Sequence, residues 1–103
     1  MSKSRIELQS ALEEVLGSRN VYFQPPESIK LQYPCIIYNI SDVDVMSANN
    51  KNYVKNIRYF LTVIDKRPDS DIYDRILDSF EMSALDRVAV VQNLNHWYMT
   101  IYW

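Results

Sequence analysis

The stretch YPCIIYNISDVDVMSANNKNYVKNIRYFLTVIDK, residues 33–66, decides the fold of this chain. It holds two apolar runs that alternate like β-strands, joined by a polar connector rich in Asn and Lys. The pattern predicts two long antiparallel strands, with a connector longer than a tight hairpin requires. The apolar alternation changes phase after Ser41, which predicts either a β-bulge in the first strand or a strand that leaves its sheet.

The second of these strands, predicted over about residues 55–65, is apolar on both of its alternating sets. Tyr59 and Leu61 belong to one set, and Phe60 and Ile64 belong to the other. A strand that is apolar on both sides is typical of the middle of a sheet. We therefore expect a central strand that is covered on both faces.

Two stripes of helical spacing flank the strands. A capping box at residues 4–7 starts the first stripe, and Gly17 ends it, so a helix is predicted over residues 4–16. Near the start of the second stripe, Asp69 or Ser70 can cap a helix. Its apolar members are Ile72, Tyr73, Ile76, Leu77 and Phe80.

The remaining segments predict strands. Residues 21–24 are expected to form a short strand or an extended segment, at an edge because two prolines end it. Residues 87–92 and 97–103 form a hairpin around the turn NLNH, residues 93–96. The order predicts one α+β domain, residues 1–103, with a mainly antiparallel sheet of four to five strands and two helices packed on one face.

Composition restricts the function classes. The chain has 103 residues and a formal net charge of −2, which argues against a general nucleic-acid binder. We find no apolar run that suits a signal peptide or a membrane span, so no membrane partner is expected. The only cysteine, Cys35, follows Pro34 at a strand start, which favours a buried thiol in a reducing cytoplasm. The only glycine, Gly17, leaves no phosphate-binding loop.

The polar residues predict no catalytic site, no metal site and no cofactor. The only histidine, His96, has no carboxylate within eight residues to orient it. The acidic group at the start of the second helix could hold Mg²⁺ or Ca²⁺, but capping and the helix dipole already explain most of it. That group consists of Asp65, Asp69, Asp71 and Asp74. Most of the mid-chain positive charge comes from Lys51, Lys55, Arg58, Lys66 and Arg67, for which a solvated face is the ordinary explanation.

Three stretches together resemble small tailed-phage proteins of the tail-completion or tail-terminator family. They are YFQPPESIKLQYPCIIYNISDVDVMSANNKNY, RYFLTVIDKRPDSDIYDRIL and DRVAVVQNLNHWYMTIYW. The resemblance covers roughly residues 20–103, and its motifs are QPPES, YPCI, ANN, TVIDKRPDS and QNLNH. The chain departs from the pattern at Gln92, where Asp is expected.

The resemblance implies a non-enzymatic structural protein of the virion. Such proteins form a hexameric ring that caps the tail tube and joins it to the head connector, so the implied partners are further copies of this chain, the tail tube protein and the head-completion protein. The implied location is the virion tail and neck, assembled in the host cytoplasm. No specific nucleic acid is implied, although the ring lumen would pass DNA. The implied contact residues are Ser47, Asn49, Asn50, Lys51, Asn52, Tyr53, Lys66 and Arg67.

Other interpretations stay open at this point. The polar connector could be an ordinary solvent-exposed loop. The chain could be another neck protein, such as a head–tail connector or stopper. It could also be a small metal-dependent nuclease or regulator that uses the acidic cluster Asp65–Asp74.

Overall fold

The computed structural model describes residues 4–48 and 52–103, with side chains described outside residues 43–56. Its elements are α1 (Arg5–Leu16), β1 (Val21–Phe23), β2 (Cys35–Ala48), β3 (Asn52–Asp65), α2 (Ile72–Ser79), β4 (Ser83–Val91) and β5 (Leu94–Tyr102). The predicted α+β class is confirmed: a five-stranded, mostly antiparallel sheet has two helices packed against it.

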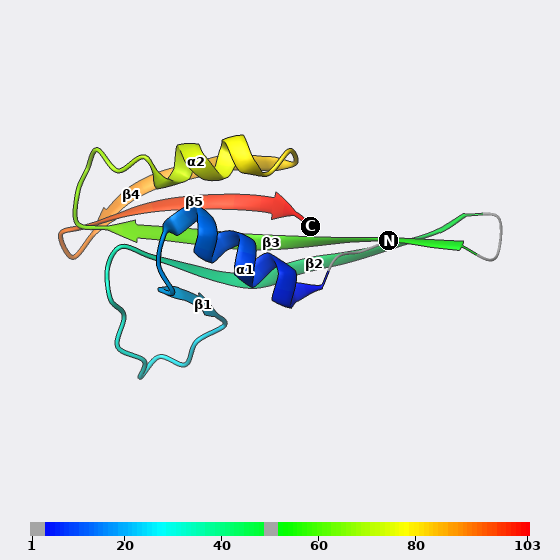
Figure 1. Cartoon of the computed structure of the whole chain (residues 1–103), viewed down its shortest axis with the longest axis horizontal. Coiled ribbons are helices and arrows are strands. Elements are labelled where there is room, and N and C mark those ends of the chain that lie inside the picture. The colour runs from blue at the N-terminus through cyan, green and yellow to red at the C-terminus, as the bar shows by residue number, and fades with distance from the viewer. Residues whose placement is uncertain (1–3, 49–51) are drawn as a thin grey trace.

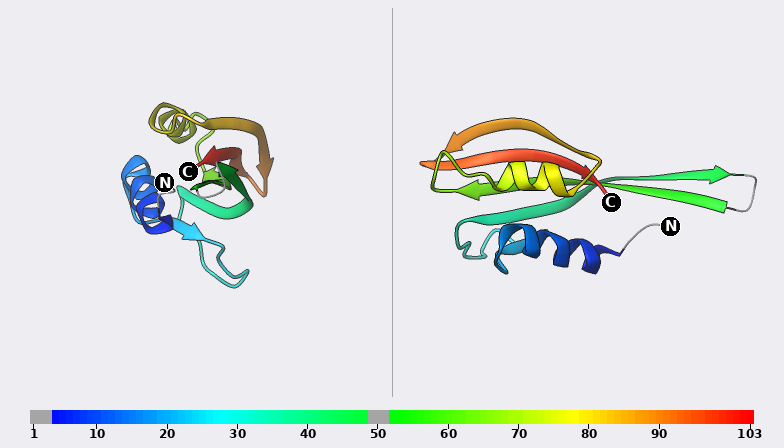
Figure 2. Two further views of the ribbon diagram at one scale, coloured as in Figure 1. Left: turned by 90° about the vertical axis from the view of Figure 1, so that its right-hand side faces the viewer. Right: turned by 45° about the horizontal axis from the view of Figure 1, so that its top comes forward.

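The strands lie in the order β1-β2-β3-β5-β4 (Figure 1). The pairing of β1 with β2 is parallel, and the three other pairings are antiparallel. The predicted central position of β3 and the predicted edge position of β1 are therefore confirmed. Both helices lie on the same side of the sheet (Figure 2).

The hydrophobic core lies between the helices and one face of the sheet. Alternate residues of the three middle strands, among them Tyr38, Leu61 and Met99, point into it and are almost fully buried. The helices supply Leu8, Leu12, Leu16, Ile72 and Ile76. Strand alternation and helical periodicity thus place the same apolar sets in one core.

The opposite face of the sheet is largely open, so the expectation of cover on both faces of β3 is wrong. Phe60 keeps 48% of its surface exposed, because both helices pack on the other side. Only the end of this face near Cys35 and Ile64 is buried; these two residues pair across β2 and β3. We refer below to the exposed remainder as the open face.

The ends of α1 follow from its sequence. Ser4 is the N-cap, and its hydroxyl accepts a hydrogen bond from the backbone N–H of Glu7 at 3.2 Å. Gly17 ends the helix in the left-handed conformation, with φ of 82°, which a residue without Cβ adopts at little cost. At α2 the expected cap by Asp69 or Ser70 is wrong. Asp71 occupies the N-cap position, and no side-chain capping bond forms there.

The bulge predicted in β2 is confirmed, since the register with β3 shifts between Ile40 and Asp42. The polar connector, however, is mostly strand. β2 continues to Ala48 and β3 begins at Asn52, not near residue 55. Backbone hydrogen bonds between paired strands form with any type of side chain. Antiparallel pairing therefore includes the polar residues in the strands, although Asn and Lys have low strand propensity.

The C-terminal hairpin has a tighter turn than the sequence predicts. Val91 pairs with Leu94, so only Gln92 and Asn93 form the turn, not residues 93–96. Their φ values are 52° and 64°, as a two-residue type I′ turn requires. This turn matches the right-handed twist of the flanking strands, which explains why the polar residues after it join β5.

We expect Leu61→Ala to lower the free energy of unfolding by about 2–5 kcal/mol, because Leu61 lies in the core with 1% of its surface exposed. Urea unfolding followed by circular dichroism measures the loss. Phe60→Ala, at the next residue on the open face, is the matched control and should cost less. Equal losses would contradict the one-sided core.

The two-residue turn indicates how Gln92, at a position where the resemblance predicts Asp, affects the free energy of unfolding. Asn and Asp tolerate positive φ better than Gln, so Gln92→Asn should raise the free energy of unfolding by about 0.5 kcal/mol. Urea unfolding measures the change, and Gln32→Asn at an exposed position outside the positive-φ residues is the control. An equal gain in both variants would contradict this explanation.

Candidate functional site

The most prominent surface feature is a two-stranded extension, which we call the arm. It consists of residues 43–48 of β2 paired with residues 52–57 of β3, and it projects beyond the rest of the sheet (Figure 1). The pairing of β3 with β5 begins at Arg58, opposite Tyr102. Beyond that point the described part of the chain offers the arm no third strand. The molecule is therefore elongated, with principal extents of 51 × 27 × 22 Å.

Polar contacts mark the base of the arm. The Arg58 guanidinium lies 3.9 Å from the Asp42 carboxylate, and its Nε donates a hydrogen bond to Ser41 Oγ at 3.2 Å. The backbone N–H of Trp103 donates to the carbonyl of Ile57 at 3.0 Å. Both members of the ion pair are largely solvated, so the pair adds little stability. These contacts instead fix where the body of the sheet ends and the arm begins.

The structure separates the predicted contact residues into two groups. Ser47 pairs with Tyr53, and Asn52 with Ala48, at the far end of the arm. Asn49, Asn50 and Lys51 lie outside the described residues. Lys66 and Arg67 follow the other end of β3, so the strand holds them apart from the end of the arm. The structure therefore does not bring the two groups together in one chain.

The open face carries a shallow depression of about 480 Å³ over the middle strands. Phe60, Thr62 and Tyr98 line it together with Arg87, whose guanidinium lies 4.6 Å from the centre of the Tyr98 ring. Exposed aromatic and Arg side chains are enriched in protein interfaces. The signal in the sequence for this surface was the second apolar set of β3, which includes Phe60 and Ile64. It did not show that the face would stay uncovered, because that depends on where both helices pack.

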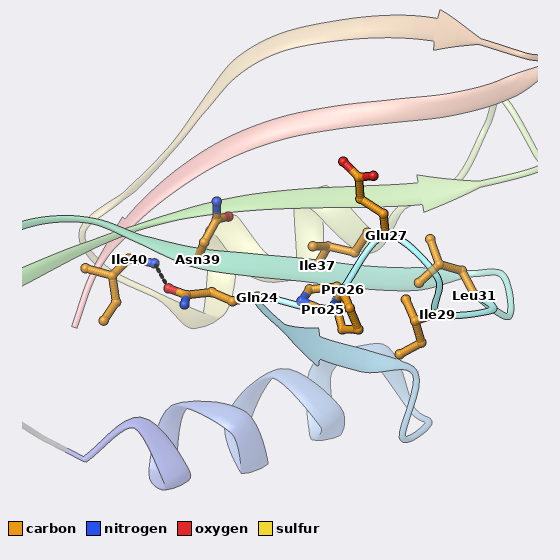
Figure 3. Close-up of a pocket in the computed structure, with 9 residues that line it drawn as sticks. All are labelled: Gln24, Pro25, Pro26, Glu27, Ile29, Leu31, Ile37, Asn39 and Ile40. Carbon is orange, nitrogen blue, oxygen red and sulfur yellow. Dashed lines mark hydrogen bonds between the residues drawn. The ribbon is translucent and has the colours of Figure 1, made fainter.

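A second depression, of about 500 Å³, lies where the loop after β1 crosses β2 (Figure 3). Gln24 lines this depression and holds the start of the loop against β2. The φ of Gln24 is 45°, its backbone N–H donates to the Tyr38 carbonyl, and its side-chain oxygen accepts a hydrogen bond from the N–H of Ile40. The Gln24 side chain thereby extends the hydrogen bonding along β2 beyond the last residue of β1. The apolar lining comes mainly from Pro25, Pro26, Ile29, Leu31 and Ile37.

The acidic group forms separate ion pairs. Asp65 is buried, accepts the backbone N–H of Arg67 and lies 3.6 Å from its guanidinium. Asp71 pairs with Arg75 at 3.4 Å, as its i, i+4 spacing predicts. The two other carboxylates of the group are exposed. Within the residues that the structure describes, no three His, Cys, Asp or Glu side chains come close enough to hold a metal ion.

Cys35 and His96 occupy structural positions. Cys35 is fully buried, and burial, with a smaller contribution from Asp65, raises the pKa of its thiol to about 11. The predicted buried thiol is thus confirmed. The Nδ1 atom of His96 lies 3.0 Å from the Leu94 carbonyl, and its ring stacks on Tyr98. His96 lies in β5 and not in a turn, because the turn ends three residues earlier than predicted, at Asn93.

Neither helix in the described residues has the length and apolar composition needed to cross a membrane. Among known protein families none matches this sequence, and no curated protein is significantly similar to it. The resemblance to tail terminators therefore rests on the sequence motifs alone. The arm and the open face are the structural features that bear on function.

The Cys35 thiol should react slowly in the folded protein. With a pKa of about 11, only about one thiol in a thousand is ionised at pH 8, and the thiolate is the reactive form. We expect iodoacetamide to alkylate native protein at least about 100-fold more slowly than protein in denaturant. Mass spectrometry over time measures both rates. Equal rates would show that Cys35 is accessible and ionised.

Proposed function

We propose that the chain is a non-enzymatic structural subunit of a phage tail, which caps the tail tube as a ring and joins it to the head connector. The arm is the observation that supports this most. Two-stranded hairpins are marginally stable in water without further packing. A hairpin that projects from the body of its own chain is therefore suited to contact with a neighbouring molecule.

A ring also requires two different surfaces on every subunit, because cyclic contacts join unlike patches. The arm is one such surface. The open face, with half-exposed Phe60 and the stacked Arg87–Tyr98 pair, is a suitable second surface on the neighbouring copy. Tyr and Arg are frequent anchors of protein contacts because they combine apolar area with hydrogen-bond donors.

The separation of the predicted contact residues fits the same geometry. Ser47, Asn52 and Tyr53 lie in the arm, and Lys66 and Arg67 follow the other end of β3. In a ring the two groups would meet different partners, such as a neighbouring subunit, the tail tube protein or the head-completion protein. The proposed place of action is the tail and neck of the virion, after assembly in the host cytoplasm.

Two alternatives remain. A head–tail connector or stopper would use the same arm at a neighbouring position of the particle. A metal-dependent nuclease or regulator built on Asp65–Asp74 would lack a ligand set among the described residues. A Mg²⁺-dependent DNA cleavage assay, with Asp69→Ala and Asp71→Ala as variants, tests that alternative. An activity that both substitutions abolish would overturn the structural proposal.

Electron microscopy of phage lysates separates terminator from neck protein. The phage would carry a stop codon in the gene for this chain. Free tails of uncontrolled length beside full, tailless heads would support a terminator. Tails of normal length that fail to join heads would indicate a neck protein, and ordinary particles would overturn both.

Substitutions at Lys51 and Tyr53 should impair assembly and leave the subunit folded. We expect Lys51→Glu and Tyr53→Ala to lower the yield of infectious particles at least about tenfold, because interface anchors carry most of the binding energy. The measurement is plaque titre after complementation with each variant, beside the melting temperature of the purified protein.

Lys30→Glu is the matched control, since it makes the same charge change at an exposed position on the loop after β1. Its titre should equal that of the wild type. A normal titre for both the Lys51 and the Tyr53 variant would contradict a contact through this part of the chain. A lowered melting temperature would show that the arm acts on the fold.

A further inference from the structure

The free edge of the sheet at β4 has the features of a self-association site. β4 is the last strand in the sheet order and is nine residues long, whereas β1 at the other edge has three. In the described part of the chain β4 pairs only with β5. Val88 and Val90 expose 53% and 67% of their surface along this edge. Long apolar edges attract further strands, and soluble proteins usually protect them.

The register of the hairpin shows which backbone groups face outward. A two-residue turn closes with a hydrogen-bonded pair, here Val91 with Leu94. Hydrogen-bonded and non-hydrogen-bonded pairs alternate along an antiparallel ladder, so Ala89 and Arg87 also direct their N–H and C=O groups to β5. Val88 and Val90 therefore direct theirs away from the sheet. The same two residues offer exposed apolar side chains and free backbone groups.

Protective features are confined to the other half of β4. The register shifts between Leu85 and Arg87, and a bulge at this point interrupts regular pairing with a further strand. The Asp86 carboxylate accepts a hydrogen bond from the Thr100 hydroxyl, and the Arg87 guanidinium lies over Tyr98. Both charges thus engage side chains of β5. The segment 88–91 has no charge and no proline of its own.

We propose that a second copy of this chain pairs with this edge, β4 against β4, antiparallel about a two-fold axis at Ala89. The sequence Val88-Ala89-Val90 reads the same in both directions, so the pairing is self-complementary. Val88 faces Val90 of the second copy, and each exchanges backbone hydrogen bonds with the other. Two five-stranded sheets then form one continuous sheet across the axis.

Three details of this register favour a second copy over an unrelated strand. The Ala89 residues meet at a non-hydrogen-bonded pair, where side chains of opposing strands are closest, and alanine is small enough for that position. Arg87 lies opposite the uncharged Val91 of the second copy. Asp86 lies in the bulge and Gln92 in the turn, so the paired segment 87–91 ends before them, and no like charges face each other across it.

The expected dimer is weak. An edge contact of a few residues buries less than the roughly 1,200 Å² of the smallest standard interfaces, which is typical of transient association. The contact does not depend on the proposed ring, because it uses the outward backbone groups of Val88 and Val90, whereas the ring uses the arm and the side chains of the open face. Failure of either proposal therefore leaves the other untouched.

Sedimentation equilibrium of the purified full chain tests the association. We expect the average mass to rise from monomer towards dimer as the concentration increases to about 1 mM. Amide hydrogen exchange, read by NMR at a low and a high concentration, locates the contact. The N–H groups of Val88 and Val90 should exchange more slowly at high concentration. A constant monomer mass, or exchange at both sites that is independent of concentration, would overturn the proposal.

Val90→Pro removes an outward N–H group and leaves the pairs of β4 with β5 intact, since edge positions tolerate proline. We expect it to weaken the dimer at least about tenfold while its circular dichroism spectrum stays native. Ile6→Lys, at an exposed apolar residue of α1, is the surface control and should dimerise as the wild type does. Unchanged dimerisation of the folded proline variant would overturn the proposal.

Two double variants test the register without a proline. In V88K/V90K the introduced lysines face each other across the axis, so the dimer should be lost. In V88K/V90E each introduced lysine faces an introduced glutamate of the second copy, so the dimer should be retained. Both variants change the same exposed positions, and sedimentation equilibrium at low salt compares them. Equal behaviour of the two would contradict the register at Ala89.

Discussion

The ladder between β2 and β3 is the interaction on which the rest of the structure depends. Each strand is fourteen residues long, and the pairing extends from Cys35 and Ile64 to the end of the arm. β1 attaches to one side of this ladder and β5 to the other, and β4 attaches to β5. The core residues Tyr38 and Leu61 face each other across it. A slip of one residue would turn these side chains to the open face, so burial fixes the register.

The ladder divides into two physically different parts. From Cys35 to the bulge after Ile40 it is part of a sheet that the helices cover, and its side chains are held in a core. Beyond Arg58 and Asp42 the described part of the chain supplies only these two strands. The bulge lies at this transition, where an extra residue shifts the register between β2 and β3. The arm is thus an extension of the central pairing and not an added loop.

The sheet also leaves different surfaces for different contacts. Its open face carries Phe60 and the Arg87–Tyr98 pair, and its β4 edge carries free backbone groups at Val88 and Val90. Edge contacts depend on backbone direction, whereas face contacts depend on side-chain shape and apolar area. The proposed ring and the proposed two-fold pairing can therefore be separated by substitution, because they use different chemical groups of one sheet.

Local periodicity along the chain was enough to predict both helices, the order of the elements, the phase change in β2 and the central position of β3, and capping residues added the bounds of α1. Gly17 and the stripe from Leu8 to Leu16 are examples. The fold was needed to show which face stays open, how far β2 and β3 extend into the polar connector, and which residues meet at one surface. These features depend on where both helices pack and on backbone pairing between distant residues. Neither leaves a periodic pattern in the chain.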